Sequence, residues 1–158
     1  MGKSIDHIVV DLDGTLLRTD IFLESIPQLI KRNPLRLIQL AIWIFQGRSI
    51  AKENVAKLVD VDVEYLPYES TLIEYLKEQK ALGKRLILAT TSHRIWAEKV
   101  AHHLRLFDHV IATDSGNNLK DNEKLAAIRN YIGAEKFCYC GDSAADRPIW
   151  SAADQLFS

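Results

Sequence analysis

The chain has 158 residues, of which 47% are hydrophobic and 26% charged, and its formal net charge is −1. This length and composition fit one domain with a sizeable core, and the balanced charge gives no electrostatic reason to expect nucleic acid as a partner. The sequence begins with no secretory signal pattern and contains no apolar run of the roughly 18 residues that a membrane span needs, so a reducing, cytoplasmic location is expected.

The first predicted element is a short buried strand over residues 7–10, because its apolar run is short and rich in β-branched residues. Asp11 and Asp13 follow it at once, and Gly14 allows a sharp turn away from the sheet. Ligand sites of open α/β sheets lie at the carboxyl ends of the strands, so these two carboxylates are well placed for chemistry. The alternative is an acidic turn without function, since Asp and Gly are common in turns.

Helical patterns follow over residues 20–32, 34–46 and 49–59. Asp20 is the expected N-cap of the first helix, and Pro27 is expected to kink or divide it. The second helix is predicted to start at Pro34, with Asn33 as its N-cap. It is unusually apolar.

Strands and helices then alternate to the end of the chain, which predicts an α/β fold with a Rossmann-like, doubly wound parallel sheet and helices on both faces. Cys138 and Cys140, two residues apart, are expected to face the same side of their strand as reduced thiols. The predicted strands lie at 84–90, 109–113 and 137–140, and the helices at 69–82, 93–106 and 121–132.

The run Asp-Leu-Asp-Gly-Thr at 11–15 resembles the first motif of the haloacid dehalogenase (HAD) superfamily, mostly Mg²⁺-dependent phosphatases and phosphotransferases. The resemblance implies that Asp11 is the nucleophile that takes the phosphoryl group. It implies that Asp13 protonates the leaving oxygen and later activates water. A cation is needed as well, because a carboxylate approaching a phosphate dianion is otherwise repelled.

The superfamily's second motif is a Thr or Ser that ends an apolar strand and holds a phosphate oxygen. Thr90 fits by position, with Thr91 beside it, whereas Ser92 is interpreted as a helix N-cap. Together with the main chain after Asp11, the resemblance implies substrate-binding roles for Gly14, Thr15, Thr90 and Thr91.

The third motif is a lysine near the start of a later helix, for which Lys124 is preferred over Lys120. Gly141 and Asp142 open a sequence that resembles the fourth motif, Gly-Asp-x-x-x-Asp. Asp142 is the expected direct ligand of Mg²⁺, and Asp146 is expected to bind the metal through water or to orient Lys124. The implied metal-binding set is Asp11, Asp13, Asp142 and Asp146.

The helices that interrupt the sheet after its first strand look like the superfamily's cap, a small domain that closes over the active site. This predicts a helical cap at 20–65 and a core formed by 1–19 and 66–158. The alternative is that these helices only cover one face of the sheet.

A narrower resemblance links the chain to the HAD domain that precedes UbiA-type membrane prenyltransferases. It is carried by DLDGTLLRTD, RNPLRLIQLAIW, LPYESTLIEYLKEQKALGKRLILATTSHR and HLRLFDHVIATDSGNNLK. It implies a polyprenyl- or other lipid-linked phosphate as substrate and a prenyltransferase or the membrane surface as partner. The apolar 34–46 helix, flanked by Lys31, Arg32, Arg36 and Arg48, fits a membrane surface and fits a buried cap core equally well.

The sequence therefore predicts a Mg²⁺-dependent phosphoric monoester hydrolase that works through an aspartyl-phosphate. Dehalogenase chemistry is disfavoured, because it has no leaving oxygen for Asp13 to protonate. Phosphotransferase or phosphomutase activity, and a non-catalytic domain that serves a membrane prenyltransferase, are the alternatives. Oligomeric state is not predicted.

Overall fold

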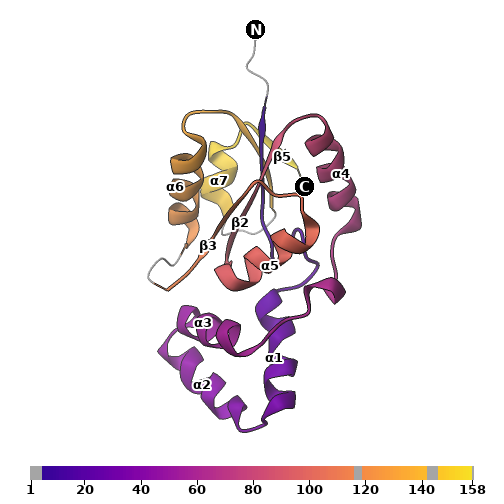
Figure 1. Cartoon of the computed structure of the whole chain (residues 1–158). Helices are drawn as coiled ribbons and strands as arrows, with labels where there is room; N and C mark the ends of the chain where they lie inside the picture. The colour runs from indigo at the N-terminus through magenta and orange to yellow at the C-terminus, as the bar shows by residue number, and fades with distance from the viewer. Residues whose placement is uncertain (1–4, 116–118, 142–145, 158) are drawn as a thin grey trace.

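The computed structural model describes residues 5–115, 119–141 and 146–157. A five-stranded parallel sheet with strand order β3-β2-β1-β4-β5 forms its centre (Figure 1). The strands are β1 (His7–Val10), β2 (Arg85–His93), β3 (His109–Thr113), β4 (Phe137–Cys140) and β5 (Gln155–Phe157). The predicted fold class, α/β with a parallel sheet, is confirmed.

Strand β1 lies in the middle of the sheet, so the residues that follow it are surrounded by the ends of its neighbours. Val10 pairs with Leu88 of β2 on one side and with Cys140 of β4 on the other. The pairing continues by one hydrogen bond, from the Asp11 backbone N–H to the Cys140 carbonyl oxygen at 2.9 Å. Because all strands are parallel, their carboxyl ends share this edge.

Alternate side chains of the strands enter two separate cores, as the pleat requires. Ile8 and Val10 join the core that contains α4 (Ser70–Ala81) and α5 (Arg94–Leu104). Val9 joins the core on the opposite face, which is covered by α6 (Asp121–Ile132) and α7 (Arg147–Ala152) (Figure 1). Cys138 and Cys140 both lie in the first core as free thiols, as expected.

Two short elements, β5 and α7, escaped the sequence analysis. Strand β5 has three residues and α7 has six, which is too little for periodicity to identify either. The first predicted β-strand and the β3 and β4 ranges agree with the structure, whereas β2 extends to His93, beyond the predicted end at Thr90.

A helical insertion follows β1 and lies beyond the carboxyl ends of the strands (Figure 1). We use "the insertion" for α1 (Ile21–Arg32), α2 (Arg36–Gln46), α3 (Arg48–Leu58) and the 3₁₀ turn η1 (Val63–Tyr65). Its apolar side chains continue the core between the sheet and α5, and the rings of Phe22 and Trp96 lie 6.3 Å apart. Such an insertion is consistent with a cap.

Three details of the insertion can be compared with the sequence predictions. Asp20 caps α1, since its Oδ1 accepts a hydrogen bond from the Phe22 backbone N–H at 2.8 Å. Pro27 does not divide α1, which runs unbroken through twelve residues. The regular second helix begins at Arg36 and not at Pro34. The Arg36 and Leu37 N–H groups donate to the Asn33 and Pro34 carbonyl oxygens three residues back, so a tight turn precedes the helix, and Asn33 Oδ1 accepts from the Leu35 N–H at 3.0 Å within it. No helix in the described ranges is long and apolar enough to span a bilayer.

Candidate active site

Two carboxylates stand where β1 ends. Gly14 adopts a φ of 76°, which favours glycine, and the chain turns back so that the Leu16 N–H reaches the Asp11 carbonyl oxygen at 3.3 Å. The turn leaves Asp11 buried at 7% exposure, at the centre of the sheet edge. A buried acid needs a compensating partner, and α6 supplies it.

Lys124 of α6 is the cation that reaches Asp11. Its side chain is 2% exposed, and its Nζ lies 2.9 Å from Asp11 Oδ1, 3.0 Å from Asp146 Oδ1 and 2.9 Å from the Tyr139 hydroxyl. An ammonium group has three N–H donors, so all three are used. Lys120, the other candidate for the motif lysine, is exposed.

Burial affects the pKa of Asp11 more strongly than the neighbouring Lys124 does. Desolvation raises the pKa of Asp11 to about 6, Lys124 opposes that rise, and the Asp146 carboxylate adds to it. Burial likewise raises the pKa of Tyr139, so its hydroxyl remains neutral beside Lys124. The network therefore holds a carboxylate that changes protonation state close to neutral pH.

Asp13 is held by the insertion on one side and by β2 on the other. Its Oδ1 accepts the Ile21 backbone N–H at 2.9 Å, and its Oδ2 accepts the Ser92 hydroxyl. Burial raises the pKa of Asp13, with a further rise from the neighbouring Asp20 carboxylate. An acid with a raised pKa suits proton donation at neutral pH.

Ser92 is not the helix N-cap that the sequence analysis expected. It belongs to β2, and His93 caps α5 in its place, with Nδ1 accepting from the Ile95 N–H at 3.3 Å. The difference arises because β2 runs three residues further than its apolar pattern suggests. Ser92 is thus a site residue that sequence reasoning missed.

The carboxylates open into a pocket of about 300 Å³ between the sheet edge and the insertion. The insertion contributes two basic side chains, and Asp20 at its start contributes a carboxylate; the sequence analysis assigned none of these three to the site. The pocket is lined by Asp11, Asp13, Asp20, Arg48, Lys52, Thr91, Lys124 and Asp146.

The four predicted substrate-binding residues are placed differently from one another. Thr91 lines the pocket, whereas Thr90 is fully buried and its Oγ1 accepts the Ser92 N–H at 3.0 Å. Gly14 and Thr15 do not line this pocket. The Thr15 hydroxyl oxygen is buried without a hydrogen-bond partner in the described part of the chain.

The predicted metal ligands are brought together only in part. Asp142 lies outside the described residues, and the described residues, Asp11, Asp13 and Asp146 included, hold no group of three or more His, Cys, Asp or Glu side chains arranged for a metal. Asp146 Oδ2 is nevertheless buried and lacks a hydrogen-bond partner among those residues. Carboxylate oxygens of this kind are the ligands that Mg²⁺ prefers, so the donors present fit that ion.

No side chain fits at position 141, because the aromatic ring of Tyr139 lies against Gly141. A Cβ atom at Gly141 would lie 2.6 Å from the Tyr139 ring, well inside contact distance. The Trp150 indole N–H fixes the same segment by donating to the Gly141 carbonyl oxygen at 3.1 Å. Gly141 therefore leaves room for the ring of Tyr139, whose hydroxyl accepts from Lys124.

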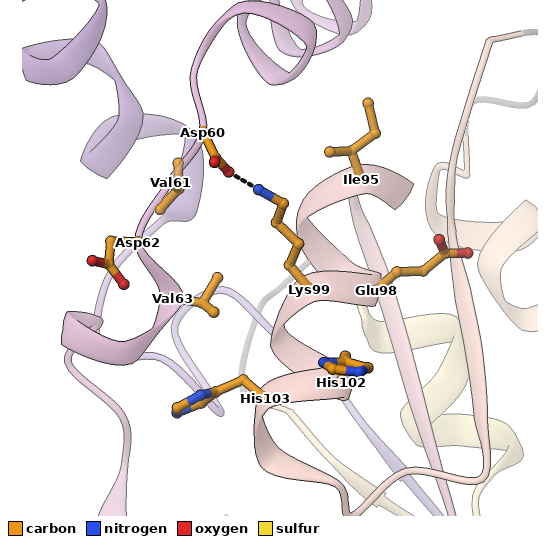
Figure 2. Close-up of a pocket in the computed structure, with 9 residues that line it drawn as sticks. All are labelled: Asp60, Val61, Asp62, Val63, Ile95, Glu98, Lys99, His102 and His103. Carbon is orange, nitrogen blue, oxygen red and sulfur yellow. Dashed lines mark ion pairs between the residues drawn. The ribbon is translucent and has the colours of Figure 1, made fainter.

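A larger hollow of about 810 Å³ lies elsewhere, between residues 60–63 and α5 (Figure 2). An ion pair between Lys99 and Asp60 spans it, and His102 and His103 lie further along the same helix. It contains none of the predicted site residues. We therefore assign the site to the smaller pocket, because the buried charges converge there.

Comparison with known proteins identifies the family of the chain. The family model for haloacid dehalogenase-like hydrolases matches residues 8–151, so the chain belongs to that family. The uncharacterized protein y4nM of Sinorhizobium fredii is 33% identical over 146 residues. That match covers 92% of this chain but 28% of y4nM, so the chain spans little more than a quarter of that relative.

Solved structures share the fold. A Bordetella pertussis Tohama I protein of unknown function superposes with a TM-score of 0.72 at 16% identity, covering 97% of this chain and 89% of the other. A substrate-bound phosphoserine phosphatase gives a TM-score of 0.62 at 15% identity, covering 98% and 86%. A phospho-aspartyl intermediate analogue of phosphoserine phosphatase gives 0.62 at 17% identity, with the same coverage.

Proposed function

We propose that this domain is a Mg²⁺-dependent phosphatase that hydrolyses phosphoric monoesters through an aspartyl-phosphate on Asp11. The observation that carries the proposal is the buried Lys124 bridge between Asp11 and Asp146, with Asp13 adjacent in the same pocket. The likeness to phosphoserine phosphatase structures, one of them a phospho-aspartyl analogue, supports it.

Asp11 would act as the nucleophile. Lys124 binds its Oδ1, which leaves Oδ2 to attack the phosphorus of the ester. The bond from phosphorus to the alcohol oxygen breaks, and Asp13 gives its proton to that oxygen. The hydrogen bonds from Ile21 and Ser92 fix Asp13 for this transfer.

Hydrolysis of the intermediate would use the same two acids in reverse. The Asp13 carboxylate takes a proton from water as the water oxygen attacks phosphorus. The acyl-phosphate bond breaks, phosphate leaves, and Asp11 is regenerated. Mg²⁺, held by Asp11, Asp13, Asp142 and Asp146, would offset the repulsion between these carboxylates and the phosphate.

The insertion would choose the substrate as the cap of this site. Arg48 and Lys52 place positive charge on the pocket wall opposite the strand ends, and Asp20 places a negative charge there. A small ester with both an anionic and a cationic group beside its phosphate, such as a phosphorylated amino acid, fits this pattern and the pocket's volume. A polyprenyl- or lipid-linked phosphate, the substrate class implied by the sequence resemblance, would place its chain outside the pocket.

Phosphate release from a panel of esters, with and without Mg²⁺, tests the proposal. The panel holds O-phosphoserine, sugar phosphates, a sugar bisphosphate and a polyprenyl monophosphate in detergent. Turnover that needs Mg²⁺ and falls at least about 10³-fold in Asp11→Asn is expected, because the attacking oxygen is lost.

Asp62→Asn is the matched control, since Asp62 caps the 3₁₀ turn outside this pocket. It should retain full activity. Folded wild-type protein that turns over no ester would contradict the phosphatase, and would favour the non-catalytic domain that serves a membrane prenyltransferase. Transfer to a sugar phosphate without release of phosphate would favour a phosphomutase.

A further inference from the structure

Helix α2 presents an apolar face to solvent. Of its eleven residues, all described, Leu40 alone is buried. Phe45 is 94% exposed and Ile38 64%, and Leu35, which precedes the helix, is 71% exposed. With Ile42, which is also exposed, they share the side of the helix away from Leu40, because a helix turns by about 100° per residue. Leu37 and Ile44 are exposed nearer the Leu40 side. A contiguous face of large exposed apolar side chains marks an interaction surface.

The sequence on either side of this face carries charges of one sign. Residues 25–52 contain five basic residues and no acidic one. They lie before, within and after α2, and the nearest acids in the sequence are Glu24 and Glu53. The five basic residues are Lys31, Arg32, Arg36, Arg48 and Lys52.

We propose that the α2 face docks on an anionic lipid bilayer. An exposed apolar helix face inserts at the boundary between headgroups and acyl chains, and basic residues at its edges attract acidic lipids. The eleven residues of α2 span roughly 16 Å, which suits shallow contact with one leaflet.

Charge complementarity favours an anionic bilayer over a second copy of the chain as the partner of the α2 face. A symmetric dimer through α2 would bring two sets of like basic charges against each other, which opposes association. An acidic bilayer surface instead attracts Lys31 and Arg36, which precede and begin α2, whereas Arg48 and Lys52 line the pocket. The inference does not depend on the reaction that the pocket carries out.

Co-sedimentation of the protein with vesicles tests the proposal. Binding is expected to vesicles of mixed phosphatidylcholine and phosphatidylglycerol, and much less to phosphatidylcholine alone. The double variant Ile38→Ser/Phe45→Ser should weaken partitioning by about tenfold for each side chain removed. Lys31→Gln/Arg36→Gln should weaken it by about fivefold per charge, and added salt should reproduce that loss.

Leu82→Ser is the matched control, because Leu82 is 72% exposed at the end of α4, on the core. It should bind vesicles like wild type. The variants change exposed residues and the half-buried Arg36, so their unfolding temperatures should stay close to the wild-type value. Failure to bind anionic vesicles, or equal binding by the Ile38→Ser/Phe45→Ser variant, would overturn the proposal. A dimer that dissociates in this variant, without vesicle binding by wild type, would assign the face to a second copy.

Discussion

The candidate active site at the sheet edge and helix α2 depart in opposite ways from the usual distribution of charged and apolar side chains in a folded protein. At the edge, Lys124, Asp11 and Asp146 are charged groups placed inside the protein. On α2, Phe45 and its neighbours are apolar groups placed in water. Buried charges and large exposed apolar patches are the informative departures. Both reduce the stability of the fold, so their presence indicates that they serve another purpose.

The two regions differ in how they are supported. Each buried charge of the edge has partners: Lys124 uses all three of its donors, and Asp13 is held on both oxygens. The exposed side chains of α2 have no comparable support, because that helix packs on the core through the buried Leu40 and the half-buried Trp43. Substitution should therefore affect stability strongly at the edge and weakly on the exposed face.

The largest effect is expected for Lys124→Met. Removing the cation leaves Asp11 and Asp146 buried beside each other without compensation. We expect a loss of about 3–5 kcal/mol in the free energy of unfolding at neutral pH, together with loss of activity. Denaturant unfolding measures the first and phosphate release the second.

Lys120→Met is the matched control for that change. Lys120 is exposed four residues earlier in the sequence, so its loss should change stability by no more than about 0.5 kcal/mol and leave activity intact. If Lys120→Met abolished activity while Lys124→Met did not, Lys120 would be the functional lysine and the Lys124 network only structural.

A pair of truncations within α2 sharpens the comparison. Leu40→Ala removes a buried side chain and should cost about 2–5 kcal/mol, whereas Phe45→Ala should cost no more than about 0.5 kcal/mol. Urea unfolding of the two variants measures the difference. A large loss in Phe45→Ala would mean that the exposed face is packed in solution.

The pH dependence tests the raised pKa of Asp11. Because the pKa in the folded protein is about 6, above its ordinary value of 3.8, the attacking carboxylate is lost as pH falls below about 6. At low Mg²⁺ we expect kcat/KM to fall on the acid side of that value, and saturating Mg²⁺ should move this limb to lower pH. Kinetics at several Mg²⁺ concentrations measure it.

The same shift predicts the stability of the metal-free protein. A pKa raised on folding stabilises the protein at low pH, and this contribution is lost as pH rises through about 6. Asp11→Asn should remove that part of the pH dependence. An unfolding free energy whose pH dependence is the same in wild type and Asp11→Asn would contradict the assignment.

The smallest effect is expected for Ser92→Ala. The Ser92 hydroxyl lowers the pKa of Asp13, so its removal should raise that pKa further. Asp13 must be protonated to act as the acid, and the alkaline limb of the rate should therefore move to higher pH by less than about one unit. Ser151→Ala, which changes an exposed serine of α7, should leave the profile unchanged.

The sequence determined the parallel sheet and most of the candidate site. Apolar runs and helical periodicity predicted β1, β3 and β4. The carboxyl ends of parallel strands lie at one edge of the sheet, whatever the path of the connecting segments. Asp11 and Asp13 were therefore placed by the position of β1 alone. Short elements such as β5 gave no periodic signal, because three residues do not complete a pattern.

Only the tertiary structure decided which residues meet. The sequence favours Lys124 over Lys120 as the motif lysine, and the packing of α6 buries Lys124 against Asp11 and leaves Lys120 in water. Ser92 reaches Asp13 across 79 positions of the chain, and no local pattern encodes such a contact. The apolar 34–46 segment fitted a buried cap core and a membrane surface equally, and the structure leaves its outer face exposed. Burial is decided by what packs against a helix, which the helix's own sequence does not specify.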